Sequence, residues 1–142
     1  MFLSYSFTLW GLWLILLTVV VQSIVAAVAH RKQSQYIPGK VDENLSHDSF
    51  VFRSHRTFHN SLENLAIFVM PVLIAIFAGA DPQTLTWIVW IYAIARIIHM
   101  ALYYAIATEK NPSPRSYFYM IGLVATLAAY VVVAWELLSR GA

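Results

Sequence analysis

The sequence predicts an all-α integral membrane protein, a bundle of four transmembrane helices that forms a single domain over residues 1–142. The first observation is composition: 60% of the residues are hydrophobic and only 11% are charged, whereas soluble domains average about 25% charged residues. The second is that the apolar residues gather in four runs, each long enough to cross a hydrocarbon core of about 30 Å. The third is the absence of cysteine, which excludes a disulfide framework, a thiolate metal site and a catalytic cysteine.

The four spans are expected at residues 7–29, 58–80, 84–107 and 115–138. The first apolar run ends at a basic cluster that begins with His30. Pro71 lies inside the second run, and we expect it to kink that helix, which membrane helices tolerate when neighbours satisfy the freed carbonyl group. Residues 79–82 (GADP) form a tight turn before the third run, and residues 111–114 (NPSP) separate the third run from the fourth.

The distribution of Lys and Arg predicts the orientation of the spans. The segments before the second and fourth spans are basic, whereas the turn between the second and third spans has no Lys or Arg, the N-terminus has none and the C-terminus has Arg140 alone. By the positive-inside rule, both basic segments are cytoplasmic and both termini lie on the other side. The short loops favour a bacterial inner membrane, with the endoplasmic reticulum as the alternative. A net charge of +2 gives no electrostatic basis for a nucleic-acid partner.

Arg96 lies near the centre of the third span, where an arginine costs about 2.5–3.5 kcal/mol on insertion scales. It should therefore face protein, with a carboxylate nearby. Glu63, one turn inside the second span, is the best candidate, and we expect an Arg96–Glu63 ion pair. Two interpretations stay open: the pair only fixes the register of the two helices, or it also belongs to a site.

Polar side chains of three spans lie at one depth, because steps of three and four residues keep them on one face of each helix. The stripes are Arg53, Arg56, Asn60 and Glu63 in the second span; Arg96, His99 and Tyr103 in the third; and Arg115 and Tyr119 in the fourth, where Ser116 adds a neutral hydrogen-bonding group. With Arg31 at the end of the first span, they predict a site for an anionic, peptide-like or carboxylate-bearing ligand. The alternative is a pocket for a lipid head group.

Two further patterns have simpler interpretations. His55 and His59 are four residues apart, a spacing found in metal sites, but the sequence places no third ligand, so we expect no metal. The tryptophans fall toward the non-cytoplasmic halves of their spans and are typical of an interfacial belt. They are Trp10, Trp13, Trp87, Trp90 and Trp135.

Three stretches within the stripes form recognisable motifs. Residues 56–64 (RTFHNSLEN) resemble the R-x-x-x-N-x-x-E-N signature of the MAPEG family, the membrane-associated proteins in eicosanoid and glutathione metabolism. Residues 95–103 (ARIIHMALY) and 115–119 (RSYFY) look like the family's second and third signatures. The motifs follow one another on the expected spans, and the resemblance covers all four spans. Within the family, the chain looks most like the microsomal glutathione transferases and the microsomal prostaglandin E synthase.

The resemblance implies a homotrimer with three glutathione sites between neighbouring subunits, near the cytoplasmic face. In the family's enzymes the arginine matching Arg115 stabilises the glutathione thiolate, and the serine matching Ser116 lies nearby. The implied glutathione-binding residues are Arg56, His59, Asn60, Glu63, His99, Tyr103, Tyr119 and Arg31. His59 replaces an arginine of the prostaglandin-synthase-like members, and either His30 or Arg31 matches the basic residue at the end of the first span.

The implied activity is that of a detoxifying glutathione transferase, with glutathione peroxidase activity as a second reaction. A nearby cation lowers the pKa of a free thiol from about 8.5, so that bound thiolate attacks a hydrophobic electrophile or a lipid. The alternative is a non-catalytic, lipid-presenting trimer similar to the five-lipoxygenase-activating protein; a third class is a structural trimer. Arg115 together with Asn60 and Glu63 favours the enzyme, because a lipid presenter has no need to hold these residues together. The sequence does not identify the second substrate.

Overall fold

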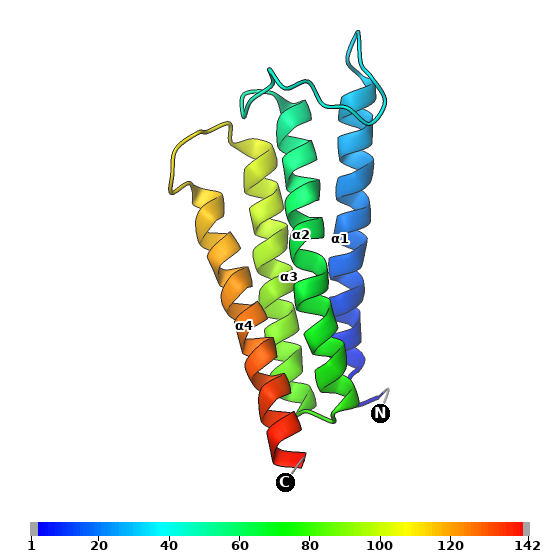
Figure 1. The fold of residues 1–142 in the computed structure, drawn as a ribbon, viewed down its shortest axis with the longest axis vertical. Helices are drawn as coiled ribbons and strands as arrows, with labels where there is room; N and C mark the ends of the chain where they lie inside the picture. Colours follow the sequence, from blue (N-terminus) through cyan, green and yellow to red (C-terminus); the bar gives the residue numbers. More distant parts are fainter. Residues whose placement is uncertain (1–2, 141–142) are drawn as a thin grey trace.

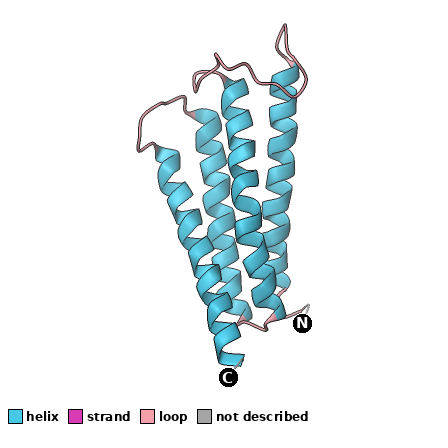
Figure 2. Cartoon of the chain, viewed as in Figure 1, coloured by secondary structure: helices cyan, strands magenta, loops and turns pink. Residues whose placement is uncertain are grey.

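Four long helices make up the structure, a computed structural model that describes residues 3–140. The helices are α1 (Ser6–Arg31), α2 (Phe50–Phe77), α3 (Pro82–Ala105) and α4 (Pro114–Arg140). They run up and down beside one another (Figure 1), with loops only at the two ends of the bundle (Figure 2). All four are long and apolar enough to cross a membrane. The predicted fold class, an all-α membrane bundle of four spans, is confirmed.

The two central helices, α2 and α3, hold the bundle together. α1 packs against both of them, and α4 packs against both from the other side, whereas α1 and α4 do not pack against each other within the described chain. The two long connections, residues 32–49 and 106–113, lie at one end of the bundle, and both termini lie at the other (Figure 1). The two basic segments therefore share one end.

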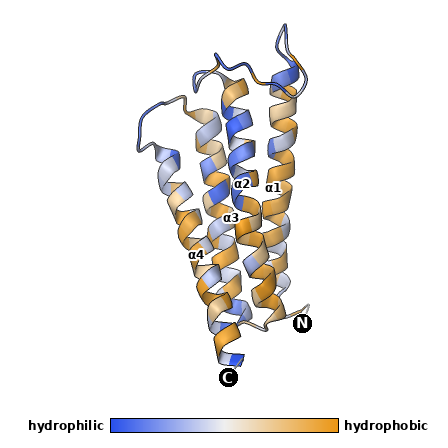
Figure 3. Ribbon diagram, viewed as in Figure 1, coloured by the Kyte–Doolittle hydropathy of each residue, from blue (hydrophilic) through white to orange (hydrophobic). Residues whose placement is uncertain are grey.

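The apolar core lies toward the end that holds the termini. Phe68 of α2 and Tyr92 of α3 stack with ring centroids 3.6 Å apart and planes 4° from parallel. The hydroxyl of Tyr5 donates to the carbonyl oxygen of Ala80 at 2.6 Å, which ties the start of α1 to the α2–α3 turn. Hydrophilic residues instead gather on α2, α3 and the start of α4 near the long connections (Figure 3). The polar stripes thus share one depth, as predicted.

The α2 helix begins at Phe50, eight residues before the start that the apolar run predicted. Its first two turns contain polar residues whose hydroxyls bond within the helix: Ser54 donates to the carbonyl of Val51, and Thr57 donates to that of Arg53. Both side chains are buried. Hydropathy alone misses this start, because the additional turns are amphipathic and not apolar. The helix also continues through Pro71.

The α2–α3 turn depends on a glycine and a helix cap. Gly79 has φ +75°, a left-handed conformation that glycine adopts without steric cost. Asp81 then caps α3, because its carboxylate accepts from the backbone N–H of Thr84 at 2.7 Å. This pair of signals ends α2 and starts α3 with only residues 78–81 between them, as the GADP turn predicted.

α1 and α3 approach each other closely at Gly11. A Cβ atom there would lie 2.5 Å from Cγ1 of Val89, so we expect Gly11→Ala to force the two helices apart and to lower the free energy of unfolding by about 1–3 kcal/mol. Thermal unfolding in detergent measures this change. Gly122→Ala is the matched control, because a Cβ atom there would lie no closer than 3.4 Å to any neighbour, the nearest being Cδ of Arg96. Equal destabilisation by both variants would contradict close packing at Gly11.

Candidate functional site

Arg96 is buried in the middle of the bundle, with 6% of its surface exposed. Its Nη2 atom donates to Oδ1 of Asn60 at 2.6 Å and to the hydroxyl of Ser61 at 3.3 Å. Its guanidinium carbon also lies 5.9 Å from the ring centroid of Tyr119. One α3 side chain therefore contacts both α2 and α4, at the depth where the three polar stripes meet.

The expected Arg96–Glu63 ion pair does not form within the chain. Between residues 3 and 140 the hydrogen-bond acceptors of Arg96 are Asn60 and Ser61, and Glu63 is exposed on α2. The physical reason is helical rotation: three residues turn an α-helix by about 300°, so Glu63 points about 60° away from Asn60. The sequence identified the right turn of α2 and the wrong residue on it.

Arg115 stands at the start of α4, above a tyrosine of α3. Its guanidinium carbon is 4.1 Å from the ring centroid of Tyr103, a cation–π contact. Nη2 donates to the carbonyl oxygen of Thr108 at 3.3 Å. Nη1 is buried and has no hydrogen-bond partner among the described residues. The arrangement fixes the positive charge and leaves one buried donor for an anionic ligand.

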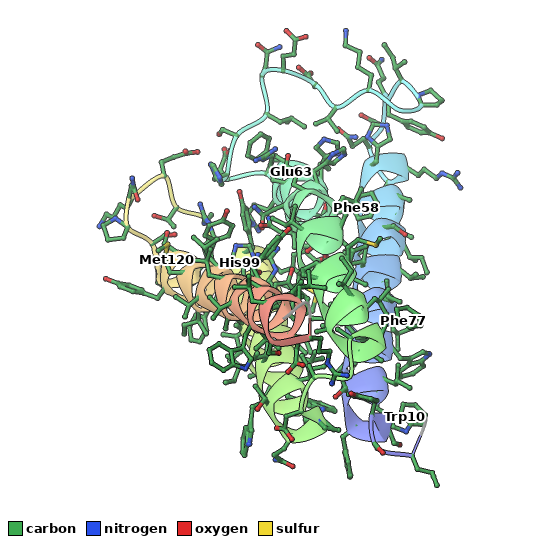
Figure 4. All side chains as sticks on the ribbon, turned by 60° about the horizontal axis from the view of Figure 1, so that its bottom comes forward. Trp10, Phe58, Glu63, Phe77, His99 and Met120 are labelled. Carbon is green, nitrogen blue, oxygen red and sulfur yellow. The ribbon has the colours of Figure 1, made fainter. Side chains whose placement is uncertain are left out.

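His99 completes an inner cluster with the aromatic residues around Arg115. Its ring centroid lies 5.7 Å from that of Tyr103 and 6.3 Å from that of Tyr119. Its Nδ1 atom is buried without a partner in the part of the chain described. Figure 4 shows His99 beside α4, far from Phe77 and Trp10, which stand at the outer edge of the bundle. We call this group the inner cluster; it consists of Asn60, Arg96, His99, Tyr103, Arg115 and Tyr119.

Ser116 has a local role at the start of α4. Its Oγ atom accepts from the backbone N–H of Ser113 at 3.2 Å and lies 3.1 Å from the hydroxyl of the same residue. The neighbouring Ser113 is 3% exposed. The two serines therefore organise the turn that presents Arg115.

Besides Ser116, four predicted site residues lie outside the inner cluster. Arg31 and His59 line a groove of about 480 Å³ between the end of α1, the loop after it and the start of α2, together with His55 and Phe58. The other two lie on α2: Glu63 is exposed, and Arg56 is half-buried without a hydrogen bond to residues 3–140. We call this set the outer group; it consists of Arg31, Arg56, His59 and Glu63. Within one chain, the predicted site residues therefore fall into two separate groups.

Two contacts at the site were not predicted. His47, in the α1–α2 connection, lies with Nε2 3.0 Å from the hydroxyl of Tyr103 and Nδ1 2.7 Å from Oε1 of Glu109. Arg53 holds this segment in place, because its Nη1 donates to the carbonyl oxygens of His47 and Asp48. No sequence motif marks these loop residues, and only their position beside Tyr103 connects them with the site.

A comparison with protein families bears on all of these residues. The family model of the MAPEG family matches residues 7–135, which reach from α1 into the last turns of α4. The chain belongs to the MAPEG family. The resemblance carried by the three motifs is therefore confirmed, and this MAPEG protein is an integral, multi-pass membrane protein. Comparisons with curated proteins and with solved structures gave no match.

The histidines of this MAPEG protein form no evident metal centre. The rings of His55 and His59 lie 4.1 Å apart between centroids, but the described residues contain no group of three or more potential metal ligands. The pair lines the groove beside Arg31, where imidazole groups also suit an anionic ligand.

The hydrogen bond between Arg96 and Asn60 is testable in this MAPEG protein. We expect Asn60→Leu to lower the free energy of unfolding in detergent by about 1.5–3 kcal/mol, because a buried charge loses its acceptor. Glu63→Gln is the control and should leave the unfolding temperature unchanged. Equal losses in both variants would show that Glu63 supports Arg96 across a subunit boundary.

The contact between the two connections depends on pH. Hydrogen bonds from His47 hold the pKa of Glu109 below its ordinary value of 4.5, so the contact is fully present above that pH and is lost as the pH falls through the lowered pKa. Hydrogen exchange of residues 42–49, corrected for intrinsic rates, should therefore rise in acid. We expect Glu109→Gln to show the rise already at neutral pH and Glu43→Gln, an exposed control, to match the wild type. Unchanged protection in Glu109→Gln would mean that the carboxylate does not hold the loop.

Proposed function

We propose that this protein is a membrane-bound glutathione transferase that activates the glutathione thiol beside Arg115. The MAPEG family includes glutathione transferases and related enzymes, and this chain carries the arrangement that such chemistry requires. The bound thiolate conjugates hydrophobic electrophiles and, as a second reaction, reduces lipid hydroperoxides. Glutathione acts as a co-substrate, and no metal takes part.

The observation that carries this proposal is the unpartnered donor of Arg115. Tyr103 and Thr108 fix the guanidinium group, while the buried Nη1 atom has no acceptor among residues 3–140. An unsatisfied buried donor costs about 1–3 kcal/mol, so an anion that accepts this hydrogen bond is stabilised. A thiolate fits the requirement, because a neighbouring arginine lowers the pKa of a thiol.

We further propose a homotrimer, with the glutathione sites between subunits. The inner cluster lies between α2, α3 and α4, whereas Arg31 and His59 of the outer group line the groove on the α1 side of α2. A neighbouring copy would bring the outer group of one chain against the inner cluster of the next. Cations of the outer group such as Arg31 and Arg56 would then bind the glutathione carboxylates, and Glu63 would bind its amino group.

An apolar groove between α3 and α4 supports a hydrophobic second substrate. It has a volume of about 330 Å³, and its lining includes Ile91, Met120 and Val124. Met120 follows Tyr119 of the inner cluster directly, and Figure 4 shows it on the side of the bundle that α4 covers. A lipophilic molecule that enters from the membrane through this groove would reach the thiolate side of Arg115.

The same groove supports one other candidate function. Its lining exposes no polar surface, which also suits a protein that presents a lipid and catalyses nothing. Arg115 favours the enzyme, because lipid presentation does not require a buried, unpartnered cation. We place the site toward the cytoplasm and both termini on the opposite side of a bacterial inner membrane, following the positive-inside rule.

Replacement of Arg115 tests the proposal. Purified wild-type trimer should produce the ultraviolet absorbance of a thiolate in stopped-flow mixing with glutathione at neutral pH. In Arg115→Ala we expect the thiolate fraction to fall about 20-fold, from most of the bound thiol to a few per cent, as the pKa returns to about 8.5. Turnover of a chlorodinitrobenzene electrophile should fall in parallel.

Lys110→Ala is the matched control, since it removes an exposed positive charge from the same connection and should leave the thiolate signal unchanged. Sedimentation in detergent should give the same trimer for both variants. Absence of a thiolate signal and of turnover in the wild type would refute the enzyme, and loss of assembly in Arg115→Ala would make this residue structural.

A further inference from the structure

Three side chains form a continuous hydrogen-bonded chain from the loop surface to the inner cluster. Oε1 of Glu109 lies 2.7 Å from Nδ1 of His47, and Nε2 of the same imidazole lies 3.0 Å from the hydroxyl of Tyr103. The backbone N–H of His47 also donates to Glu109 at 3.1 Å. The residues come from the α1–α2 connection, α3 and the α3–α4 connection, which meet at one end of the bundle (Figure 1).

The ionised carboxylate of Glu109 determines the tautomer of His47. A carboxylate only accepts hydrogen bonds, so Nδ1 at 2.7 Å must carry a hydrogen. In the neutral imidazole Nε2 is then an acceptor. The hydroxyl of Tyr103 must therefore donate its proton to Nε2. The direction of the chain is fixed from Tyr103 through His47 to Glu109.

This direction leaves the lone pairs of the Tyr103 oxygen as acceptors. A hydroxyl group has one proton and two lone pairs, and the proton is already engaged with His47. The guanidinium carbon of Arg115 also lies 4.1 Å from the ring centroid of Tyr103. A thiol that binds the unpartnered Nη1 of Arg115 and also hydrogen-bonds to the Tyr103 oxygen has an acceptor for its proton. Arginine itself does not take up a proton, because it is always charged.

We propose that Tyr103, His47 and Glu109 form a proton relay that ionises the glutathione thiol opposite Arg115, a role that rests on the function proposed above. The S–H bond breaks and its electron pair stays on sulfur. The proton passes to the Tyr103 oxygen as the hydroxyl proton of Tyr103 passes to Nε2 of His47. The products are a thiolate beside Arg115 and an imidazolium whose Nδ1–H stays bonded to the Glu109 carboxylate. Tyr103 ends as it began, with one proton.

The charges around His47 are consistent with this role. Glu109 stabilises the imidazolium directly, and the nearest other site cation, Arg115, contacts the ring of Tyr103 at 4.1 Å. Arg53 donates to the backbone carbonyl of His47 and not to its ring, and the carboxylate of Asp48 accepts from Ser46. The His47 side chain is 19% exposed and that of Glu109 is 67% exposed. The proton can therefore leave to water after the thiolate has formed.

The test is the pH dependence of thiolate formation in the full-length trimer, followed by stopped-flow absorbance with glutathione. In the wild type the rate should rise with pH and then level off, as expected for a general-base step. In His47→Gln this rise should disappear, and the rate at neutral pH should fall about 100-fold, the usual size of general-base catalysis. Glu109→Gln should move the rise to lower pH, because the imidazolium loses its carboxylate.

Two comparisons separate a relay from a loop contact that only stabilises the fold. Asp48→Asn removes a neighbouring, exposed loop carboxylate and should keep the wild-type pH profile and rate. The double variant His47→Gln/Tyr103→Phe should be no slower than His47→Gln alone, because residues that act as one unit are not additive. Calorimetry with glutathione should give the same affinity for His47→Gln as for the wild type.

Each remaining outcome decides between the proposals. A wild-type protein without a thiolate signal refutes the proposed function itself. A wild-type signal together with an unchanged pH profile in His47→Gln refutes the relay and leaves the function intact, as does an altered profile in Asp48→Asn. If His47→Gln does not fold, the pH shift in Glu109→Gln decides, and an unshifted profile there overturns the relay.

Discussion

A buried positive charge in an apolar bundle is the constraint on which the rest of the structure depends. An arginine at the centre of a membrane span is stable only where it faces protein, and Arg96 faces α2, where its Nη2 atom donates to Asn60 and Ser61. α4 approaches the same side chain at Gly122, where a Cβ atom would lie 3.4 Å from Cδ of Arg96. Three helices thus meet at one guanidinium group. Their register places the polar halves of α2, α3 and α4 together at the end of the bundle that carries the long connections.

Most other polar groups in the spans are satisfied within their own helix. Hydroxyls that donate to the carbonyl four residues back are those of Thr18, Thr57, Thr86 and Thr126. Such local bonds carry polar residues across the bilayer without a partner helix. The buried exceptions in the helices, among residues 3–140, include Gln22, His99 and Arg115, and all of them lie in the half near the long connections. Buried polar groups without a hydrogen-bond partner are therefore concentrated in the half of the bundle where the site is proposed.

The fold was predictable from sequence because its determinants are local. Hydropathy located four spans, and helical periodicity placed Asn60, His99 and Tyr103 at one depth. Glu63 was expected to pair with Arg96 because it is the nearest carboxylate in the spans, but within the chain the amide oxygen of Asn60, about 60° away on the same turn, accepts from Arg96. Periodicity failed in the loops: His47 and Glu109 are 62 residues apart in segments without a regular period. Only the folded chain brings them together.

Arg115 and His47 have different tasks because their side chains differ in chemistry: one keeps a fixed charge and the other can take up a proton. Arg115 lies against helical Tyr103 and keeps its charge at any physiological pH, so it stabilises a thiolate but accepts no proton. A second group must take that proton, and the inner cluster offers His99, which is 4% exposed and has no carboxylate partner within the described chain. An imidazolium at that depth would be poorly solvated. His47 has a carboxylate partner and contact with water, and for this reason a loop residue, and not a buried one, is suited to receive the proton.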